Sequence, residues 1–241
     1  MHHSVKKLQS VELKNTTPFK LFVWKLRRFI RDLLGGQDLL DTSARGTKNK
    51  LKAREVYLKF DDFIAKYLPT LVKETPRSVA LKRIKETLER ELHYTFSEID
   101  ETKPWGAYYR IDDSEADRFL EEFFPGLDPI EARLGRKNLV LSPKILVVCP
   151  GQRLSWQYHN RRAERWRFLT HGGYHRSHSD NEGQVHHAEP DDIVQFATGE
   201  RHRLVALPSG YTLVAEIWQH TNAKYPSEES DIVRLQDDYK R

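Results

Sequence analysis

Four side chains with metal-ligating chemistry lie in the second half of this sequence. Gln157 and His159 are two positions apart, so they share one face if their segment is a β-strand. Glu164 follows five residues after His159, and His202 comes after a turn that contains Gly199. Two imidazoles, a carboxylate and a side-chain carbonyl form a donor set suited to Zn²⁺, Mn²⁺, Co²⁺ or Fe²⁺. The sequence therefore predicts a site for one divalent metal ion, without fixing which of these it is.

Short β-type segments surround these four residues. Gly, Pro, Asp and Asn turns separate the segments, and this spacing is typical of an antiparallel sandwich or barrel. The segments span residues 145–149, 165–170, 174–178, 193–196, 203–207 and 212–218. One helix, predicted over residues 114–124, interrupts the β region.

Residues 1–98 have helical rather than β periodicity. Apolar residues recur at helical spacing over 19–34 and 51–68, and a third helix is predicted to start with Thr75 as N-cap and Pro76 as its first residue. We interpret the region as a packing or oligomerisation element, which is compatible with a homodimer. The alternative is that 19–34 lies on a membrane surface as a basic amphipathic helix. A helix packed on a neighbour shows the same apolar stripe, so no membrane partner is expected.

Charge is distributed unevenly along the chain. Residues 1–100 carry 21 Lys and Arg against 13 Asp and Glu, a net charge of +8, whereas residues 101–241 carry 19 against 22, a net charge of −3. Because the basic excess belongs to the helical region, it does not indicate a nucleic-acid partner.

Cys149 is the only cysteine, which excludes an internal disulfide and favours a reducing compartment. With no signal-peptide core and no apolar run long enough to span a bilayer, we expect a cytoplasmic protein.

The ordered set of Gly, His, Glu and a later Gly-turn-His resembles the two motifs of the cupins. More narrowly, it is similar to the isomerase domain of the type II mannose-6-phosphate isomerases. The residues that fall on that family's pattern are Lys144, Pro150, Gly151, Leu154, Ser155, Gln157, His159, Arg162, Glu164 and Trp166. Residues 104–106 (Pro-Trp-Gly) and 230–241 resemble the segments that open and close the same domain. The resemblance implies a mainly β fold, with a cupin (double-stranded β-helix or jelly-roll) barrel over residues 99–241 after an α-helical region over residues 1–98.

The resemblance also implies an activity, which is the aldose–ketose isomerisation of a sugar phosphate. Glu216 matches a family carboxylate and would be the base that moves a proton between C1 and C2; alternatively, it is a solvent-facing strand residue. Lys144, Arg162 and Arg203 would bind the phosphate, and His175 would contact substrate from a histidine-rich hairpin. The other histidines of that hairpin face water or the barrel mouth, or form a second metal site.

Several residues depart from the family pattern. Asn160, Arg161 and Arg165 stand at positions where the family has histidine, and no nucleotide-binding loop or guanylyltransferase domain is found in residues 1–100. Two further functions therefore stay open besides the isomerase. One is a cupin enzyme acting on another sugar phosphate, a nucleotide sugar or another small substrate, and the other is a non-catalytic sugar-binding or regulatory cupin.

Overall fold

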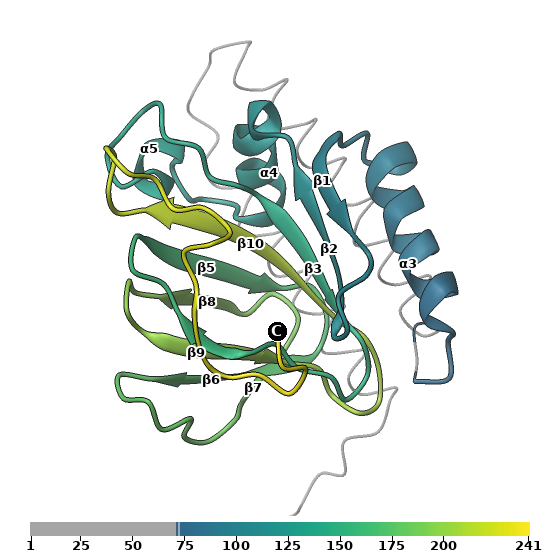
Figure 1. Cartoon of the computed structure of the whole chain (residues 1–241). Coiled ribbons are helices and arrows are strands. Elements are labelled where there is room, and N and C mark those ends of the chain that lie inside the picture. The colour runs from purple at the N-terminus through teal and green to yellow at the C-terminus, as the bar shows by residue number, and fades with distance from the viewer. Residues whose placement is uncertain (1–70, 72) are drawn as a thin grey trace, which may run out of the picture. The chain divides into compact units, whose positions relative to one another are not determined.

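Two antiparallel sheets pack face to face in the part of the chain that the structure describes, residue 71 and residues 73–241 of a computed structural model (Figure 1). One sheet has the strand order β1-β2-β3-β10-β5-β8 and the other has the order β11-β4-β9-β6-β7. Their strands are β1 (Phe96–Asp100), β2 (Gly106–Ile111), β3 (Lys144–Val148), β4 (Trp156–Tyr158), β5 (Arg162–Phe168), β6 (Gly172–Ser177), β7 (His186–Ala188), β8 (Ile193–Phe196), β9 (Arg201–Val205), β10 (Thr212–His220) and β11 (Val233–Gln236). The helices predicted over 19–34 and 51–68 lie outside the described residues.

The strands from β3 to β10 follow a jelly-roll path. They form the four-strand orders β3-β10-β5-β8 and β4-β9-β6-β7, one in each sheet, while β1, β2 and β11 extend the edges. This order is typical of the eight-stranded jelly roll, or double-stranded β-helix. The predicted fold class, a mainly β cupin barrel, is therefore confirmed for the described residues.

All six predicted segments form strands, with ends shifted by a few residues. Sequence patterns did not reveal β1, β2, β7 and β11. Strand β2 is buried on both faces, so it lacks the apolar–polar alternation of a half-exposed strand. Strands β7 and β11 have only three and four residues, which is too short for a clear pattern.

The larger sheet is covered on both faces, and β10 illustrates how its residues divide. Leu213, Ala215 and Ile217 pack in a core that includes helical side chains. Val214, which alternates with them, packs in the second core between the two sheets. Glu216 lies on this second face, so the alternation brings a carboxyl group into the barrel interior.

Helices cover the outer face of the larger sheet (Figure 1). They are α3 (Arg77–Glu86), α4 (Ala116–Phe123) and α5 (Pro129–Ala132), with a π-helical turn (Thr87–Glu91) after α3. Helix α3 begins one residue later than predicted, because Pro76 is its N-cap. Leu81 and Ile84 of α3 belong to the same core as β2, β3 and β10. The boundary expected between residues 98 and 99 falls within β1, and this core includes side chains on both sides of it.

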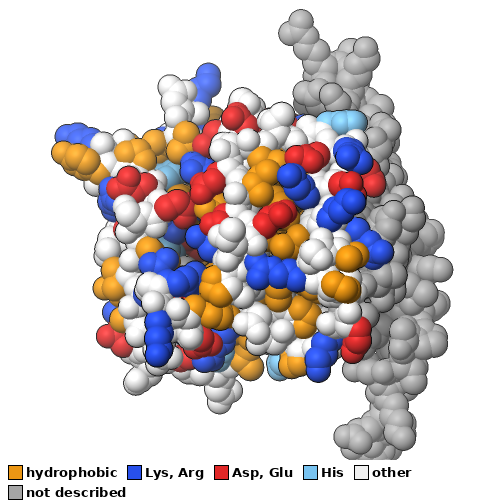
Figure 2. Space-filling view, turned by 45° about the vertical axis from the view of Figure 1, so that its right-hand side comes forward, with side chains coloured by type: hydrophobic (Ala, Val, Ile, Leu, Met, Phe, Trp, Pro, Cys, Tyr) orange, Lys and Arg blue, Asp and Glu red, His pale blue; other side chains and the backbone are white. Residues whose placement is uncertain are grey.

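Charged side chains are mixed on the visible surface. On the face shown in Figure 2, Lys and Arg are interspersed with Asp and Glu rather than gathered into one basic patch. Every helix within the described ranges is too short or too polar to cross a bilayer.

Glu122 of α4 is a buried carboxyl group. Its side chain accepts a hydrogen bond from the Tyr94 hydroxyl and lies 3.6 Å from the Arg118 guanidinium. Burial raises the pKa of Glu122 to about 7. Because this lies above the ordinary value of 4.5, the folded state holds the proton more tightly than the unfolded chain. The resulting stabilisation is complete below pH 4.5 and is lost as the pH rises through 7.

We expect the Glu122→Gln substitution to remove up to about 3 kcal/mol of the difference in unfolding free energy between pH 4.5 and pH 8. Urea unfolding of both proteins at the two pH values measures this difference. Glu121→Gln is the matched control, because Glu121 is exposed on the same helix. If Glu122→Gln kept the pH dependence of the wild type, the carboxyl group would not be the source of it.

Candidate metal centre

The barrel brings His159, Glu164 and His202 together. His159 directly follows β4, Glu164 lies on β5, and His202 lies on β9 opposite Gln157. His159 Nε2 is 3.0 Å from Glu164 Oε1, and His202 Nε2 is 3.2 Å from Glu164 Oε2. One ligand atom from each of the three lies within 4.8 Å of the others, and all three side chains are buried.

Both imidazoles are oriented by backbone carbonyls. His159 Nδ1 lies 2.6 Å from the carbonyl oxygen of Asp231, and His202 Nδ1 lies 2.9 Å from that of Glu200. A carbonyl oxygen can only accept, so each Nδ1 carries the proton and donates it. Each Nε2 is then left with its lone pair, which is the arrangement found in metal-ligating histidines.

The electrostatics of the three side chains fit a bound cation. Burial lowers the pKa of His159, which favours the neutral imidazole. Burial alone would raise the pKa of Glu164, but the surrounding charges and hydrogen bonds, Arg162 among them, outweigh burial and hold that pKa well below the usual range, so Glu164 is a carboxylate. Within the described ranges, Glu164 Oε2 and His202 Nε2 are buried and have no hydrogen-bond partner. A carboxylate oxygen and an imidazole lone pair facing each other need a cation between them, so this donor set fits a divalent metal.

Gln157, the fourth predicted ligand, lies beside the other three. Its Oε1 accepts a hydrogen bond from the Ser155 hydroxyl at 2.6 Å, and its Nε2 is 3.5 Å from His159 Nε2. In this orientation the carbonyl oxygen is directed at Ser155. Rotation of the amide would turn that oxygen toward His159 and complete the predicted set.

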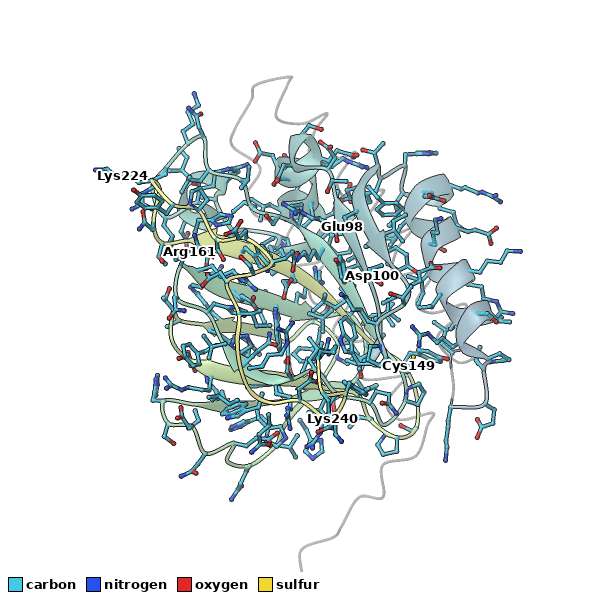
Figure 3. All side chains as sticks on the ribbon, viewed as in Figure 1. Glu98, Asp100, Cys149, Arg161, Lys224 and Lys240 are labelled. Atoms are coloured by element: carbon cyan, nitrogen blue, oxygen red, sulfur yellow. The ribbon has the colours of Figure 1, made fainter. Side chains whose placement is uncertain are left out.

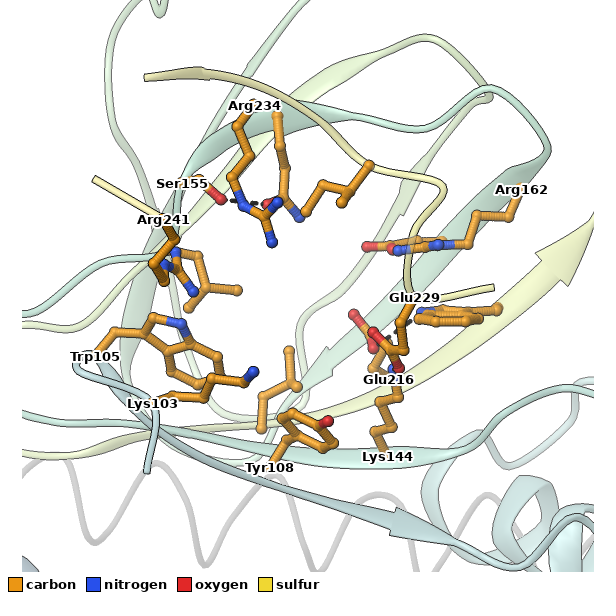
Figure 4. A pocket seen from close by; sticks show the side chains of 16 residues that line it. Lys103, Trp105, Tyr108, Lys144, Ser155, Arg162, Glu216, Glu229, Arg234 and Arg241 are labelled. Carbon is orange, nitrogen blue, oxygen red and sulfur yellow. Dashed lines mark hydrogen bonds and ion pairs between the residues drawn. The ribbon is translucent and has the colours of Figure 1, made fainter. Parts of the chain in front are cut away.

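A pocket opens from this group into the barrel (Figure 4). It has about 610 Å³ of empty space, a volume that includes the part open to solvent. Its charged lining residues are Lys103, Lys144, Arg162, Glu164, Glu216, Glu229, Arg234 and Arg241. Cations outnumber anions in this list, so the pocket favours an anionic ligand.

Glu216 is buried in this pocket, so the alternative of a solvent-facing residue does not hold. Its Oε1 accepts a hydrogen bond from Trp166 Nε1 at 2.9 Å, and its Oε2 accepts one from Trp218 Nε1 at 3.1 Å. Burial, followed by the charge of Glu164, raises the pKa of Glu216 to about 8. The two indole N–H groups therefore fix the position of the Glu216 carboxyl group. Its raised pKa lies close to neutral pH, which is typical of a general acid–base group.

Lys144 and Arg162 lie in the same pocket, but their charges are engaged. Lys144 forms an ion pair with Glu229. Arg162 Nε donates to Glu164 Oε1 at 2.8 Å, and its Nη2 donates to His159 Nε2 at 3.2 Å. Its Nη1 donates to groups in the segment 227–231. A metal on His159 would replace the contact from Nη2.

Arg203 and His175, which were predicted to bind substrate, lie outside the pocket. Both contact Glu182, at 2.8 Å from Arg203 Nη1 and 3.4 Å from His175 Nε2. Arg203 follows His202 directly on β9, and successive strand residues point to opposite faces. Since His202 faces the metal group, Arg203 must face away from it.

The tail after residue 228 supplies pocket residues that sequence reasoning missed. Glu229, Arg234 and Arg241 line the pocket, together with Lys103 and Trp105 ahead of β2. The family-like segments 104–106 and 230–241 contain three of these five residues. Those matches were the signal that could have identified them.

Comparisons with known proteins give no family assignment. No family model matches the chain, and no curated protein matches it. Among solved structures, a double-stranded β-helix protein from Klebsiella pneumoniae is 17% identical, covers 40% of this chain and 76% of its own, and has a TM-score of 0.33. A Cupin 2 barrel protein from Salinispora arenicola is 21% identical over 36% of this chain and 67% of its own, with a TM-score of 0.30. The capsular polysaccharide assembling protein CapF from Staphylococcus aureus is 10% identical over 66% of this chain and 47% of its own, with a TM-score of 0.40. The resemblance to type II mannose-6-phosphate isomerases is not confirmed by these findings.

Proposed function

We propose that this protein is a metal-dependent sugar-phosphate aldose–ketose isomerase, with mannose 6-phosphate or a related sugar phosphate as substrate. The observation that carries the proposal is the position of Glu216, a buried carboxyl group with a raised pKa, in the same pocket as Glu164 of the His–Glu–His group. Isomerisation needs this combination of a proton-transfer group and a cationic centre. The reaction would serve sugar-nucleotide or polysaccharide precursor metabolism.

Each pocket residue has a role in this reaction. A divalent metal on His159, Glu164 and His202 would supply Lewis-acid stabilisation of the negative charge that develops at the substrate oxygens. Glu216 in its ionised form would take the proton from C2 of the aldose and return it to C1, while the hydroxyl proton moves from O2 to O1. The indole N–H groups of Trp166 and Trp218 would keep its carboxyl group in one orientation during both transfers.

One contact favours a second function, a non-catalytic sugar-binding cupin. The Arg162 guanidinium donates to both His159 and Glu164, so it can supply part of the positive charge that a metal would supply. If Arg162 permanently replaces the metal, the pocket keeps its affinity for an anionic sugar and loses the Lewis acid.

A coupled isomerase assay on a panel of hexose and heptose phosphates, with and without added Zn²⁺, Mn²⁺, Co²⁺ or Fe²⁺, tests the proposal. We expect metal-dependent turnover of at least one aldose phosphate into the corresponding ketose phosphate. If the metal-loaded protein binds sugar phosphates but turns over none of them, the sugar-binding function replaces the isomerase. Equal turnover by the metal-loaded protein and by protein stripped of metal with a chelator would remove the metal from the proposal.

A further inference from the structure

The pocket has two chemically different ends (Figure 4). Glu216, Lys144 and Arg162 lie at one end, next to the metal-ligating group. The other end is formed by Arg241 and by the segment that carries Lys103 and Trp105, with Arg234 between the ends on the tail. Because Lys144 and Arg162 are engaged by Glu229, Glu164 and His159, free hydrogen-bonding capacity must be sought at the second end.

Arg234 is the cation whose charge is least balanced at this end. Lys103 is 3.0 Å from Asp100, and Arg241 is bound to Asp237 through two contacts of 3.0 Å. The side chain of Arg234, at an exposed position of β11, makes in contrast no hydrogen bond or ion pair with any residue in the described part of the chain. Partial burial, followed by the charge of the neighbouring Arg241, lowers the pKa of Arg234, and Asp237 and Glu229 offset this only in part. Two guanidinium groups that repel each other are stabilised when an anion lies between them.

A second, independent observation points to an acceptor at the same end. Trp105 is 5% exposed, and its indole Nε1 is buried without a hydrogen-bond partner among the residues that the structure describes. A buried N–H group with no acceptor costs about 1–3 kcal/mol, so such groups are rare in proteins unless a ligand or water binds them. Figure 4 shows Trp105 beside Arg241 and Lys103 at the pocket wall.

The tail that carries both arginines is fastened to the barrel. Arg153 binds Asp238 with contacts of 2.7 and 3.1 Å, and the Tyr239 hydroxyl donates to Gln152 Oε1 at 2.7 Å. Arg203 Nη2 donates to the carbonyl oxygen of residue 236 at 3.1 Å. The backbone of the tail is therefore held in place before a ligand arrives, and the contacts of Arg241 with Asp237 also position its guanidinium group, which lowers the entropic cost of binding.

We infer that Trp105, Arg234 and Arg241, assisted by Lys103, bind the phosphate group of the substrate at the end of the pocket away from Glu216. The inference rests on the proposed function for the identity of the sugar. A sugar phosphate bound in this direction has its phosphate on the arginines and its C1 and C2 at Glu216. An open-chain sugar that carries its phosphate at the end opposite C1 fits this arrangement of the two pocket ends.

Isothermal titration calorimetry with inorganic phosphate and mannose 6-phosphate tests the inference on the full chain. We expect Arg234→Gln and Arg241→Gln each to weaken binding of both ligands by about tenfold or more, as for the loss of a charge-assisted hydrogen bond. Arg234→Gln is the cleaner variant, since it disturbs no described contact. Lys240→Gln is the matched control, because Lys240 is an exposed tail residue of the same charge that does not line the pocket (Figure 3).

The subsite is rejected if Arg234→Gln binds phosphate as the wild type does, or if Lys240→Gln weakens binding equally. Because inorganic phosphate binds without any turnover, a failure to bind it differs from a failure of the proposed function. Phosphate binding that depends on Arg234 in a protein without isomerase activity retains the subsite and rejects the isomerase. Isomerase activity with an unchanged KM in Arg234→Gln retains the isomerase and rejects the subsite.

Discussion

Replacing His159 or His202 by alanine is expected to abolish stoichiometric metal binding. Each substitution removes one of three buried ligand atoms that lie within 4.8 Å of one another. The remaining imidazole and carboxylate cannot satisfy a tetrahedral or octahedral ion without several waters, for which a buried site has little room. Elemental analysis should find about one divalent transition metal per chain in the wild type and a small fraction of that in either variant.

A matched control separates a specific site from general histidine binding. His187 is exposed on β7 and does not belong to the ligand group, so His187→Ala should retain the full metal content. A chelator should lower the thermal midpoint of the wild type and leave that of His202→Ala unchanged, because only a folded-state ligand stabilises by mass action. Full metal retention in both His159→Ala and His202→Ala would contradict the assignment.

The Glu216→Gln substitution is expected to lower kcat by about 100-fold or more, the usual scale for the loss of a general acid–base group. Glutamine keeps the shape of the side chain and can still accept a hydrogen bond from Trp166 or Trp218, so fold and metal content should be unchanged. A similar KM in variant and wild type would show that ground-state binding is preserved.

Glu182→Gln is the corresponding control for a carboxylate outside the pocket. Glu182 contacts Arg203 and His175 on the other face of the smaller sheet, so its loss should leave kcat within a few-fold of the wild-type value. If Glu216→Gln retained full activity, the proton-transfer group would have to be another pocket residue. If Glu182→Gln were the inactive variant, the reaction would take place on the opposite face.

The metal-ligating group was accessible to sequence reasoning because its members lie on or next to strands at fixed spacing. Alternation along a strand and a recognisable turn were enough to predict that His159, Glu164 and His202 converge. The same alternation argues against Arg203, since two adjacent strand residues cannot both face the metal. Proximity in sequence to a ligand was the wrong criterion for that residue.

The second end of the pocket could not be predicted in the same way. Arg234 and Arg241 reach it only because the tail follows a particular path, which depends on contacts such as Arg153 with Asp238. Such tertiary contacts leave no periodic pattern of residue types in the sequence. Likewise, the engagement of Arg162 by both His159 and Glu164 depends on side-chain conformations that residue types alone do not fix.

Strand β10 has a consequence for how this chain folds. All nine of its residues are buried, and it is inserted between β3 and β5, whose residues come much earlier in the chain. Until β10 docks, β3 and β5 each present an open hydrogen-bonding edge, and closing these long loops is slow. An intermediate without β10 would expose two unpaired edges to other chains and would be prone to aggregate. Substitutions that weaken the packing of this strand therefore act on the yield of folded protein as well as on the finished site.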